Sequence, residues 1–239
     1  MIIKKFYQFV QKERMTFISN SDEIARQAIQ QIDPSLENKF ADLVRFLSIN
    51  PSMASALRGK NAARIGTEDY ILAAASNYAN GRAPKRPVPP ATIPDEMVSF
   101  VLEHYFDVDS KNLERVKKEH ALSMGAENII GNLLEHYLAS VLESLGWVWC
   151  AGSLVKAVDF IKPTPNQVDW VLLQVKNRDN SENSSSSAIR IGTTINKWHR
   201  TFSKKPGSNW TAFPDAVGSG LLSEEGFRQF VKINLKSLK

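Results

Sequence analysis

The spacing of hydrophobic residues along the chain shortens near its middle. Before residue 124, apolar side chains recur every three or four positions, which is the period of an amphipathic helix. This pattern predicts helices over residues 21–32, 36–49, 68–80, 95–106 and 110–123. The pairs Asp33-Pro34 and Asn50-Pro51 end the first two, because proline cannot continue a helix. Thr67 is suited to cap the third, so residues 1–123 are expected to form a helical region.

A proline-rich segment lies inside this helical region. Residues 84–94 hold five prolines, so the segment cannot form a helix and is predicted to be an extended linker or a surface arm. The rest of residues 1–123 contains no combination of side chains that indicates catalysis. We therefore expect the region to serve packing, dimerisation or gripping of a ligand.

Residues 124–239 begin with a helical pattern and continue with shorter, strand-like runs. A long helix is predicted after Gly125, with Gly146 in its C-cap position. The runs WVWCAG, SLVKAVDFI and QVDWVLLQVKN are rich in β-branched and aromatic residues, and the turn KPTPN joins the last two as a predicted hairpin. A polar loop, a short helix over 193–203 and a last helix near 223–231 are expected to follow. A helical region followed by an antiparallel series of short strands predicts the α+β class.

The composition narrows the class of protein. The chain has 239 residues, of which 43% are hydrophobic and 23% charged, as in an ordinary soluble globular protein. Its single cysteine, Cys150, excludes an internal disulfide framework and a zinc site with four cysteines. The N-terminal sequence is not a secretory signal, and no segment is apolar over the roughly 18 residues that a membrane helix needs. We expect a soluble, cytoplasmic protein.

The positive charge is concentrated in the last quarter of the chain. The net charge is +5, yet residues 1–173 hold 19 Lys/Arg against 20 Asp/Glu, whereas residues 174–239 hold 11 against 5. Such asymmetry predicts that this part faces a polyanion such as nucleic acid. A charged face that only keeps the protein soluble is the alternative.

Three residues of the predicted hairpin are suited to phosphodiester hydrolysis. Asp159 lies 15 positions before Gln174 with a turn between them, so the two can approach each other across the hairpin. Gln174 and Lys176 are two positions apart and therefore share one face of their strand. An aspartate followed by an acid-x-Lys tripeptide is the PD-(D/E)XK nuclease pattern. The hairpin resembles it, with Gln174 in place of the acid.

This pattern predicts a magnesium site. Asp159, Gln174 and the carbonyl of Val175 are the expected ligands of an Mg²⁺ ion that neutralises charge on the scissile phosphate. Lys176 is expected to polarise the attacking water and to stabilise developing negative charge. Because Gln174 is neutral, such a site lacks one negative charge.

Glu135 is the residue expected to compensate for this charge. It lies at the margin of the apolar stripe of the predicted long helix, as a side chain reaching into a cleft would. Asp169 is the alternative to Asp159, and Glu127 is the alternative to Glu135, although Glu127 is also suited to the first turn of the helix. The single histidines His136 and His199 are predicted to be surface or packing residues.

A polar and basic segment follows the predicted catalytic strand. Its amide, carboxylate and guanidinium groups can pair with base edges, and its basic groups can contact phosphates. The expected DNA-binding residues are Asn177, Arg178, Asp179, Asn180, Ser181, Glu182, Asn183, Arg190, Lys197 and Arg200. The phosphate contacts are expected to include Lys204 and Lys205, and Trp198 and Trp210 are expected to be aromatic residues of the same DNA-contacting surface. A flexible linker rich in Ser and Asn is the alternative for residues 177–187.

The combination of these motifs resembles the type II restriction endonucleases of the SinI/AvaII type. The matching segments are GAENIIGNLLEHYLASVLESLGWVWC, KAVDFI, LLQVKNRDNSENSSSSAIR and KWHRTFSKKPGSNWTAFPD. The resemblance implies a PD-(D/E)XK core, with a central mixed sheet flanked by helices, over residues 124–239. The DNA-recognition segment would cover residues 177–215, and residues 1–123 would form the helical N-terminal region.

The same resemblance implies an activity and partners. The protein would be a Mg²⁺-dependent homodimer that cuts double-stranded DNA at a GG(A/T)CC-like site and leaves a 5′ overhang. A companion DNA methyltransferase would protect the host. Two other hypotheses stay open: a repair or mobile-element nuclease with the same core, and a DNA-binding protein that Gln174 has made catalytically inactive.

Overall fold

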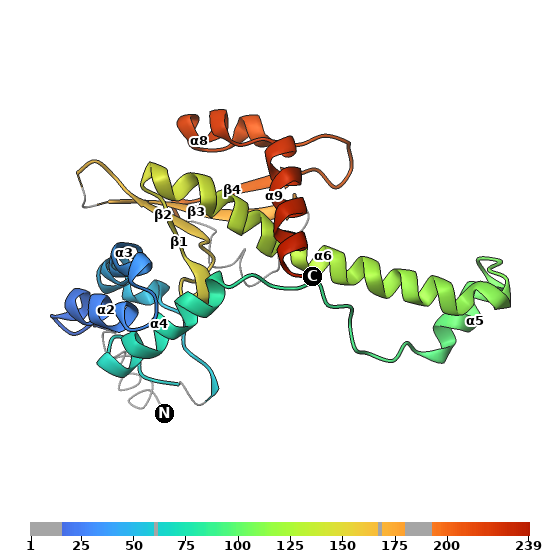
Figure 1. The fold of residues 1–239 in the computed structure, drawn as a ribbon, viewed down its shortest axis with the longest axis horizontal. Helices are drawn as coiled ribbons and strands as arrows, with labels where there is room; N and C mark the ends of the chain where they lie inside the picture. Colours follow the sequence, from blue (N-terminus) through green and yellow to red (C-terminus); the bar gives the residue numbers. More distant parts are fainter. Residues whose placement is uncertain (1–15, 60–61, 167–168, 180–192) are drawn as a thin grey trace, which may run out of the picture. The chain divides into compact units, whose positions relative to one another are not determined.

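The fold is that of a computed structural model, which describes residues 16–59, 62–166, 169–179 and 193–239. It combines helices with a four-stranded mixed sheet, which confirms the predicted α+β class (Figure 1). The chain forms two compact units. The first comprises Met1–Ala83 and Ala139–Leu221, and the second comprises Pro84–Leu138 and Leu222–Lys239. The predicted division of the chain into a helical region, residues 1–123, and a nuclease core, residues 124–239, stays a prediction.

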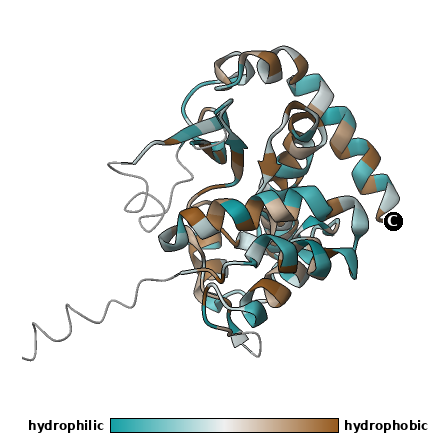
Figure 2. Cartoon of the chain, turned by 90° about the vertical axis from the view of Figure 1, so that its left-hand side faces the viewer, coloured by the Kyte–Doolittle hydropathy of each residue, from teal (hydrophilic) through white to brown (hydrophobic). Residues whose placement is uncertain are grey.

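Three of the predicted helices belong to the first unit and are confirmed. They are α2 (Ser21–Gln30), α3 (Glu37–Ile49) and α4 (Glu68–Arg82). The Thr67 side chain caps α4 by accepting a hydrogen bond from the Tyr70 N–H, as predicted. The apolar stripes of α3 and α4 meet at Phe40 and Tyr78, whose ring centroids lie 5.2 Å apart. Figure 2 shows the resulting alternation of hydrophobic and polar residues along the helices.

The sheet belongs to the same unit and carries the candidate site. Its strands are β1 (Val148–Trp149), β2 (Phe160–Pro163), β3 (Trp170–Arg178) and β4 (Ile195–Thr201), in the spatial order β1-β2-β3-β4. Strands β1, β2 and β3 are successively antiparallel, which confirms the predicted hairpin. The hairpin turn is closed by Thr164, whose N–H and hydroxyl both donate to the Asp169 carbonyl. Strand β4 pairs parallel to β3, so the sheet is mixed.

The helix predicted over residues 193–203 is wrong, because this segment is strand β4. Its side chains alternate between the two faces of the sheet, and parallel pairing with β3 satisfies its backbone groups. The interpretation of Trp198 and Trp210 as aromatic residues of a DNA-contacting surface is wrong as well. Both are buried and pack against each other with ring centroids 5.2 Å apart, so they belong to the core.

The second unit contains α5 (Glu96–His104), most of α6 (Leu113–Leu142) and α9 (Glu224–Ser237). The helix break predicted at Gly125 is wrong, since α6 runs continuously through it. Glycine is required there for another reason: a Cβ at Gly125 would lie 2.9 Å from the nitrogen of Pro89. The proline-rich segment, which is not helical, therefore passes close against α6. Helix α9 is longer than predicted, and its Phe227 and Phe230 flank Tyr137 of α6.

The remaining elements are short. Helix α8 spans Ala216–Leu221. Short 3-10 helices cover Pro34–Leu36, Pro51–Met53, Ser110–Asn112, Glu143–Leu145, Ala151–Ser153 and Trp210–Ala212. Gly146 follows one of them with a φ of 84°, in the C-cap position predicted for it. Among the described residues, no helix has the length and apolar character that crossing a bilayer requires.

Candidate active site

Hydrogen bonds to β3 hold Asp159 opposite Gln174. In the β2–β3 register Phe160 pairs with Leu173, so Asp159, one residue before β2, lies across from Gln174. The Asp159 N–H donates to the Leu173 carbonyl over 2.9 Å. Its carboxylate Oδ2 accepts a hydrogen bond of 2.7 Å from the Val175 N–H. Main chain and side chain of Asp159 are therefore both fixed to the same strand.

The structure brings Asp159, Gln174 and Lys176 together on one face of the sheet. Directly opposed residues of an antiparallel pair share a face, and so do residues two apart on a strand. The positive charge of Lys176 acts on the Asp159 carboxyl group and favours its ionised form. The sequence prediction for this geometry agrees with the structure, while the catalytic roles of the three residues stay a prediction.

Gln174 is buried with an unused acceptor. The residue is only 1% exposed, and its side-chain Oε1 has no hydrogen-bond partner among the residues that the structure describes. A buried amide oxygen without a partner destabilises the folded state, typically by about 1–3 kcal/mol. An oxygen ligand for a cation would have this character, because the metal ion takes the place of the missing donor. Gln174 therefore fits the predicted role of a neutral metal ligand.

The environment of Asp159 also favours a nearby cation. Its carboxyl group is surrounded by protein atoms, and this burial raises its pKa. The hydrogen bond from the Val175 N–H and the charge of Lys176 oppose the rise without cancelling it. A buried carboxylate whose ionised form is disfavoured gains more from a divalent cation than an exposed one does.

The predicted ligand set is poor in charge. The described residues contain no group of three or more His, Cys, Asp or Glu side chains that could hold a metal ion. A cation at Asp159 would thus be bound by one carboxylate and by neutral oxygens such as that of Gln174. This donor set suits Mg²⁺, which binds through one or two carboxylates and completes its shell with water and substrate phosphates.

Strand β4 adds two residues that the sequence did not place at this site. Lys197 pairs with Gln174 and His199 pairs with Lys176 in the parallel register, so both lie on the face that carries Asp159. Lys197 had been expected in a helix, and His199 had been interpreted as a packing or surface residue. His199 does pack on Phe202, with ring centroids 5.2 Å apart. The alternation Lys197, Trp198, His199 was the signal that could have revealed a strand.

The opposite face of the same strands holds other residues of the predicted DNA-binding set. Asn177 lies on that face, where its Oδ1 accepts a hydrogen bond of 2.9 Å from Arg200 Nε. Asp179, in the turn after β3, accepts a hydrogen bond of 2.8 Å from the Ser203 N–H. Arg178 is exposed at the end of β3 and, two residues after Lys176, lies on the face of Asp159 instead. Their DNA contacts stay predictions, and Asn180, Ser181, Glu182, Asn183 and Arg190 lie outside the described residues.

The other acidic candidates are Glu135 and Glu127 of α6 and Asp169 of the β2–β3 turn. Glu135 is half-buried on α6, in the second unit, so its role at Asp159 stays a prediction. Glu127 is exposed on α6, far from the helix start at Leu113, and the alternative of a first-turn acid is therefore wrong. Asp169 lies in the β2–β3 turn, where its Oδ2 accepts a hydrogen bond of 3.2 Å from Asn166. Asp159 is thus the carboxylate that the hairpin brings to Gln174.

Comparisons with known proteins identify the family of the chain. The model of the SinI restriction endonuclease family matches residues 21–237. The chain belongs to the SinI restriction endonuclease family. It is 51% identical over 218 residues to the type II restriction enzyme Eco47I of Escherichia coli, covering 91% of this chain and 95% of that enzyme. It is 50% identical over 228 residues to the type II restriction enzyme SinI of Salmonella infantis, covering 95% of this chain and 99% of that enzyme.

Membership in the SinI family confirms the resemblance drawn from the sequence motifs. The motifs covered the part of the chain after residue 124, whereas the family match begins at residue 21 and includes α2, α3 and α4. The N-terminal helices are therefore part of the SinI-family architecture as well.

Proposed function

We propose that the protein is a type II restriction endonuclease that hydrolyses phosphodiester bonds in both strands of double-stranded DNA, with Mg²⁺, as a homodimer. Membership in the SinI family supports the activity. The convergence of a carboxylate, an amide oxygen and an ammonium group on one face of the sheet is the observation that carries the proposal. These three groups correspond to the PD-(D/E)XK set, with the neutral Gln174 in place of the second acid.

Each residue of the site is proposed to have its own role in this reaction. Asp159 and the free oxygen of Gln174 would hold the Mg²⁺ ion, and the Val175 N–H keeps the carboxylate in place. When bound, the ion supplies neutralisation of phosphate charge and lowers the pKa of a water ligand. The Lys176 ammonium polarises the attacking water and stabilises the negative charge that develops on the phosphate. Val175 is proposed as a further ligand through its carbonyl oxygen.

DNA recognition is assigned to the residues that follow the catalytic strand. We propose that the segment 177–190 reads base edges at a GG(A/T)CC-like site, and that Lys197 contacts DNA beside Gln174. Glu135 is proposed to contribute negative charge to the metal site. A cytoplasmic enzyme of this kind requires a companion DNA methyltransferase that protects the same site in the host.

The proposal is tested by sequencing the ends that the protein produces on DNA of known sequence. With Mg²⁺, we expect discrete fragments whose ends all fall at one short sequence, and no cutting when the ion is chelated. A smear of random ends would contradict site specificity and would indicate another DNA-processing nuclease. Retarded but uncut DNA would contradict the catalytic role and would indicate a DNA-binding protein.

A further inference from the structure

Residues 84–124, called the arm here, carry an unusual amount of exposed apolar surface. Helix α5 has the sequence EMVSFVLEH, and none of its residues is buried. Of the 16 large hydrophobic side chains that are exposed in the described residues, ten lie in the arm. They are Val88, Ile93, Met97, Val98, Phe100, Val101, Tyr105, Phe106, Leu122 and Met124. An apolar surface of this density marks an interaction site in a protein that is otherwise polar outside.

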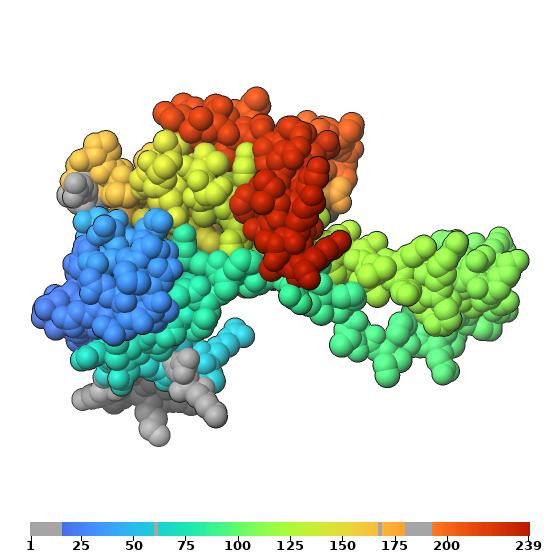
Figure 3. Space-filling model, viewed as in Figure 1, coloured from blue at the N-terminus to red at the C-terminus, as the bar shows by residue number. Residues whose placement is uncertain are grey.

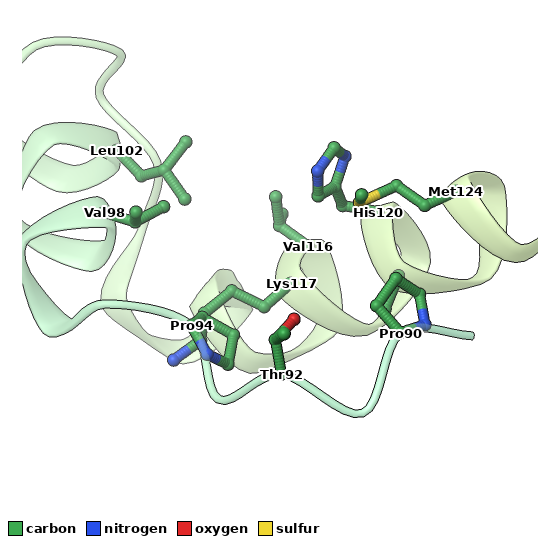
Figure 4. A pocket seen from close by; sticks show the side chains of 10 residues that line it. Pro90, Thr92, Pro94, Val98, Leu102, Val116, Lys117, His120 and Met124 are labelled. Carbon is green, nitrogen blue, oxygen red and sulfur yellow. The ribbon is translucent and has the colours of Figure 1, made fainter. Parts of the chain in front are cut away.

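The arm also contains an apolar cavity open to solvent. The proline-rich segment, α5 and the first half of α6 enclose about 450 Å³. Figure 4 shows Pro90, Pro94, Val98, Val116 and Met124 around this space, with Lys117 and His120 at its border. The segments of the arm come close together without closing into a core. Such a cavity accepts apolar side chains from outside.

We propose that the arm is the surface through which two copies of this chain associate. The inference rests on the proposed function, because a dimer that cuts both strands of a symmetric site needs two copies of the Asp159 site related by a two-fold axis. It adds the place of the interface: apolar side chains of α5 on one copy contact the arm of the other. Figure 3 shows the outer surface of this region, in green.

The charges of the arm are complementary to themselves. Residues 95–109 contain five acidic residues and no Lys or Arg, whereas residues 111–118 contain four Lys or Arg and one acid. A two-fold axis brings the same patch of both copies together, so an acidic α5 can face the basic start of the partner's α6. Within one copy, Lys117–Glu114 and Arg115–Glu119 pair along α6, and Lys111–Asp109 joins the acidic and the basic segment, while Glu96, Glu103 and Lys118 remain for contacts with a partner. Self-complementarity of this kind is what a symmetric interface requires.

The charge balance distinguishes a protein partner from DNA. The arm as a whole holds six Lys/Arg and seven Asp/Glu, whereas residues 174–239 hold 11 and 5. DNA binding depends on phosphate neutralisation by basic residues, and a slightly acidic surface opposes it. A second copy of the chain therefore fits the arm better than the substrate does.

The test measures the mass of the full-length protein by sedimentation equilibrium without DNA, from about 0.1 to 50 μM, a range typical of specific interfaces. We expect twice the protomer mass of 26.8 kDa. For the variant Phe100→Glu/Val101→Glu, we expect the dissociation constant of the dimer to rise at least about tenfold. The control Ile49→Glu alters a residue of α3 that is 57% exposed and should leave the mass unchanged. Circular dichroism shows whether each variant is folded.

Charge reversal provides a second test, which does not depend on the apolar variant being folded. Glu96→Lys/Glu103→Lys and Arg115→Glu/Lys118→Glu should each weaken association, and the four changes combined should restore it. A wild-type protein that is a monomer at every concentration overturns the proposal, and so does a folded Phe100→Glu/Val101→Glu variant that associates normally. If the variant keeps its dimer mass and loses only DNA affinity, the arm binds DNA and the proposal is wrong.

The mass measurement requires neither DNA nor catalysis, so its outcome is independent of the proposed endonuclease activity. A protein that dimerises through the arm but never cuts DNA contradicts the endonuclease assignment alone. A protein that cuts DNA specifically but stays a monomer in solution contradicts the arm interface and the proposed homodimer, and it leaves the endonuclease activity standing.

Discussion

The two faces of the β3–β4 strand pair differ in how their polar groups are satisfied. On one face Gln174 is buried with an oxygen that has no partner in the described part of the chain, and burial raises the pKa of Asp159. On the other face Asn177 and Arg200 satisfy each other through a hydrogen bond of 2.9 Å. Polar groups left unsatisfied in a folded protein mark the place where a ligand or ion is expected.

The side chains of the opposite face also form part of the hydrophobic core. Trp198 is buried there against Trp210 and Phe213, with ring centroids 5.2 and 5.1 Å apart. Lys162, on the same face of β2, donates to Asp215 over 3.0 Å. The face of Asp159 is thus the one proposed to carry the chemistry, whereas the side chains on the face of Trp198 stabilise the fold.

The largest difference between the faces is expected in catalysis. Asp159→Asn and Lys176→Ala should each slow DNA cutting by about 10²–10⁴-fold, because they remove a metal ligand and the charge that stabilises the transition state. Gel retardation should show that DNA binding survives. The matched control is Asp169→Asn, in the β2–β3 turn, which should cut at close to the wild-type rate. Full activity of Lys176→Ala would remove the proposed site.

A smaller effect is expected on stability when the unsatisfied oxygen is removed. Gln174→Leu should keep the free energy of unfolding or raise it by up to about 1–2 kcal/mol, because a buried acceptor without a partner disappears. Cutting should be lost in the same variant. Denaturant unfolding without Mg²⁺ measures the first quantity. A clear loss of stability would mean that Gln174 is an ordinary hydrogen-bonded core residue.

Asp215, which binds Lys162 of the opposite face, should make the free energy of unfolding depend on pH, with an effect on the order of 1–2 kcal/mol. Burial alone would raise the pKa of Asp215. The hydrogen bonds that its carboxylate accepts from the Gly218 N–H, Lys162 and Trp147 together outweigh this effect of burial. The pKa falls from 3.8 to about 2. A lowered pKa stabilises the folded state above the unfolded pKa of 3.8, and this contribution disappears as the pH falls toward 2.

Asp215→Asn should therefore lower the free energy of unfolding at pH 7, with a difference from wild type that shrinks between about pH 4 and pH 2. Unfolding curves at a series of pH values measure it. The rate of DNA cutting by the folded variant at pH 7 should stay close to wild type. A pH-independent difference would show that charge at Asp215 is not the cause.

Local patterns predicted most of the first unit and the geometry of the site. The helices α2, α3 and α4 have periodic apolar stripes and clear end signals, and the β2–β3 hairpin has a short connection. The approach of Asp159 to Gln174 followed from these neighbours in sequence. Apolar stripes, helix-end signals and short connections are all visible within a few consecutive residues, so their prediction needs no knowledge of contacts far apart in the sequence.

The sequence prediction was wrong for elements that depend on contacts between residues far apart in the sequence. Strand β4 is stabilised by parallel pairing with β3, and a segment as short as residues 193–203 does not by itself distinguish a strand from a helix. The error concealed Lys197 and His199, which β4 places beside Gln174 and Lys176. Gly125 was taken as a helix boundary, although its lack of a side chain serves the close approach of Pro89.

The central claim is that one carboxylate and one amide oxygen of the β2–β3 hairpin hold the catalytic cation. The most direct measurement is the Mg²⁺ dependence of DNA cutting by wild type and Gln174→Glu, which adds a negative charge to the donor set without changing its size. We expect half-maximal cutting at a Mg²⁺ concentration about tenfold lower in Gln174→Glu, because affinity rises with the charge of the ligands. The same Mg²⁺ dependence in both proteins, at equal maximal rates, would contradict the claim.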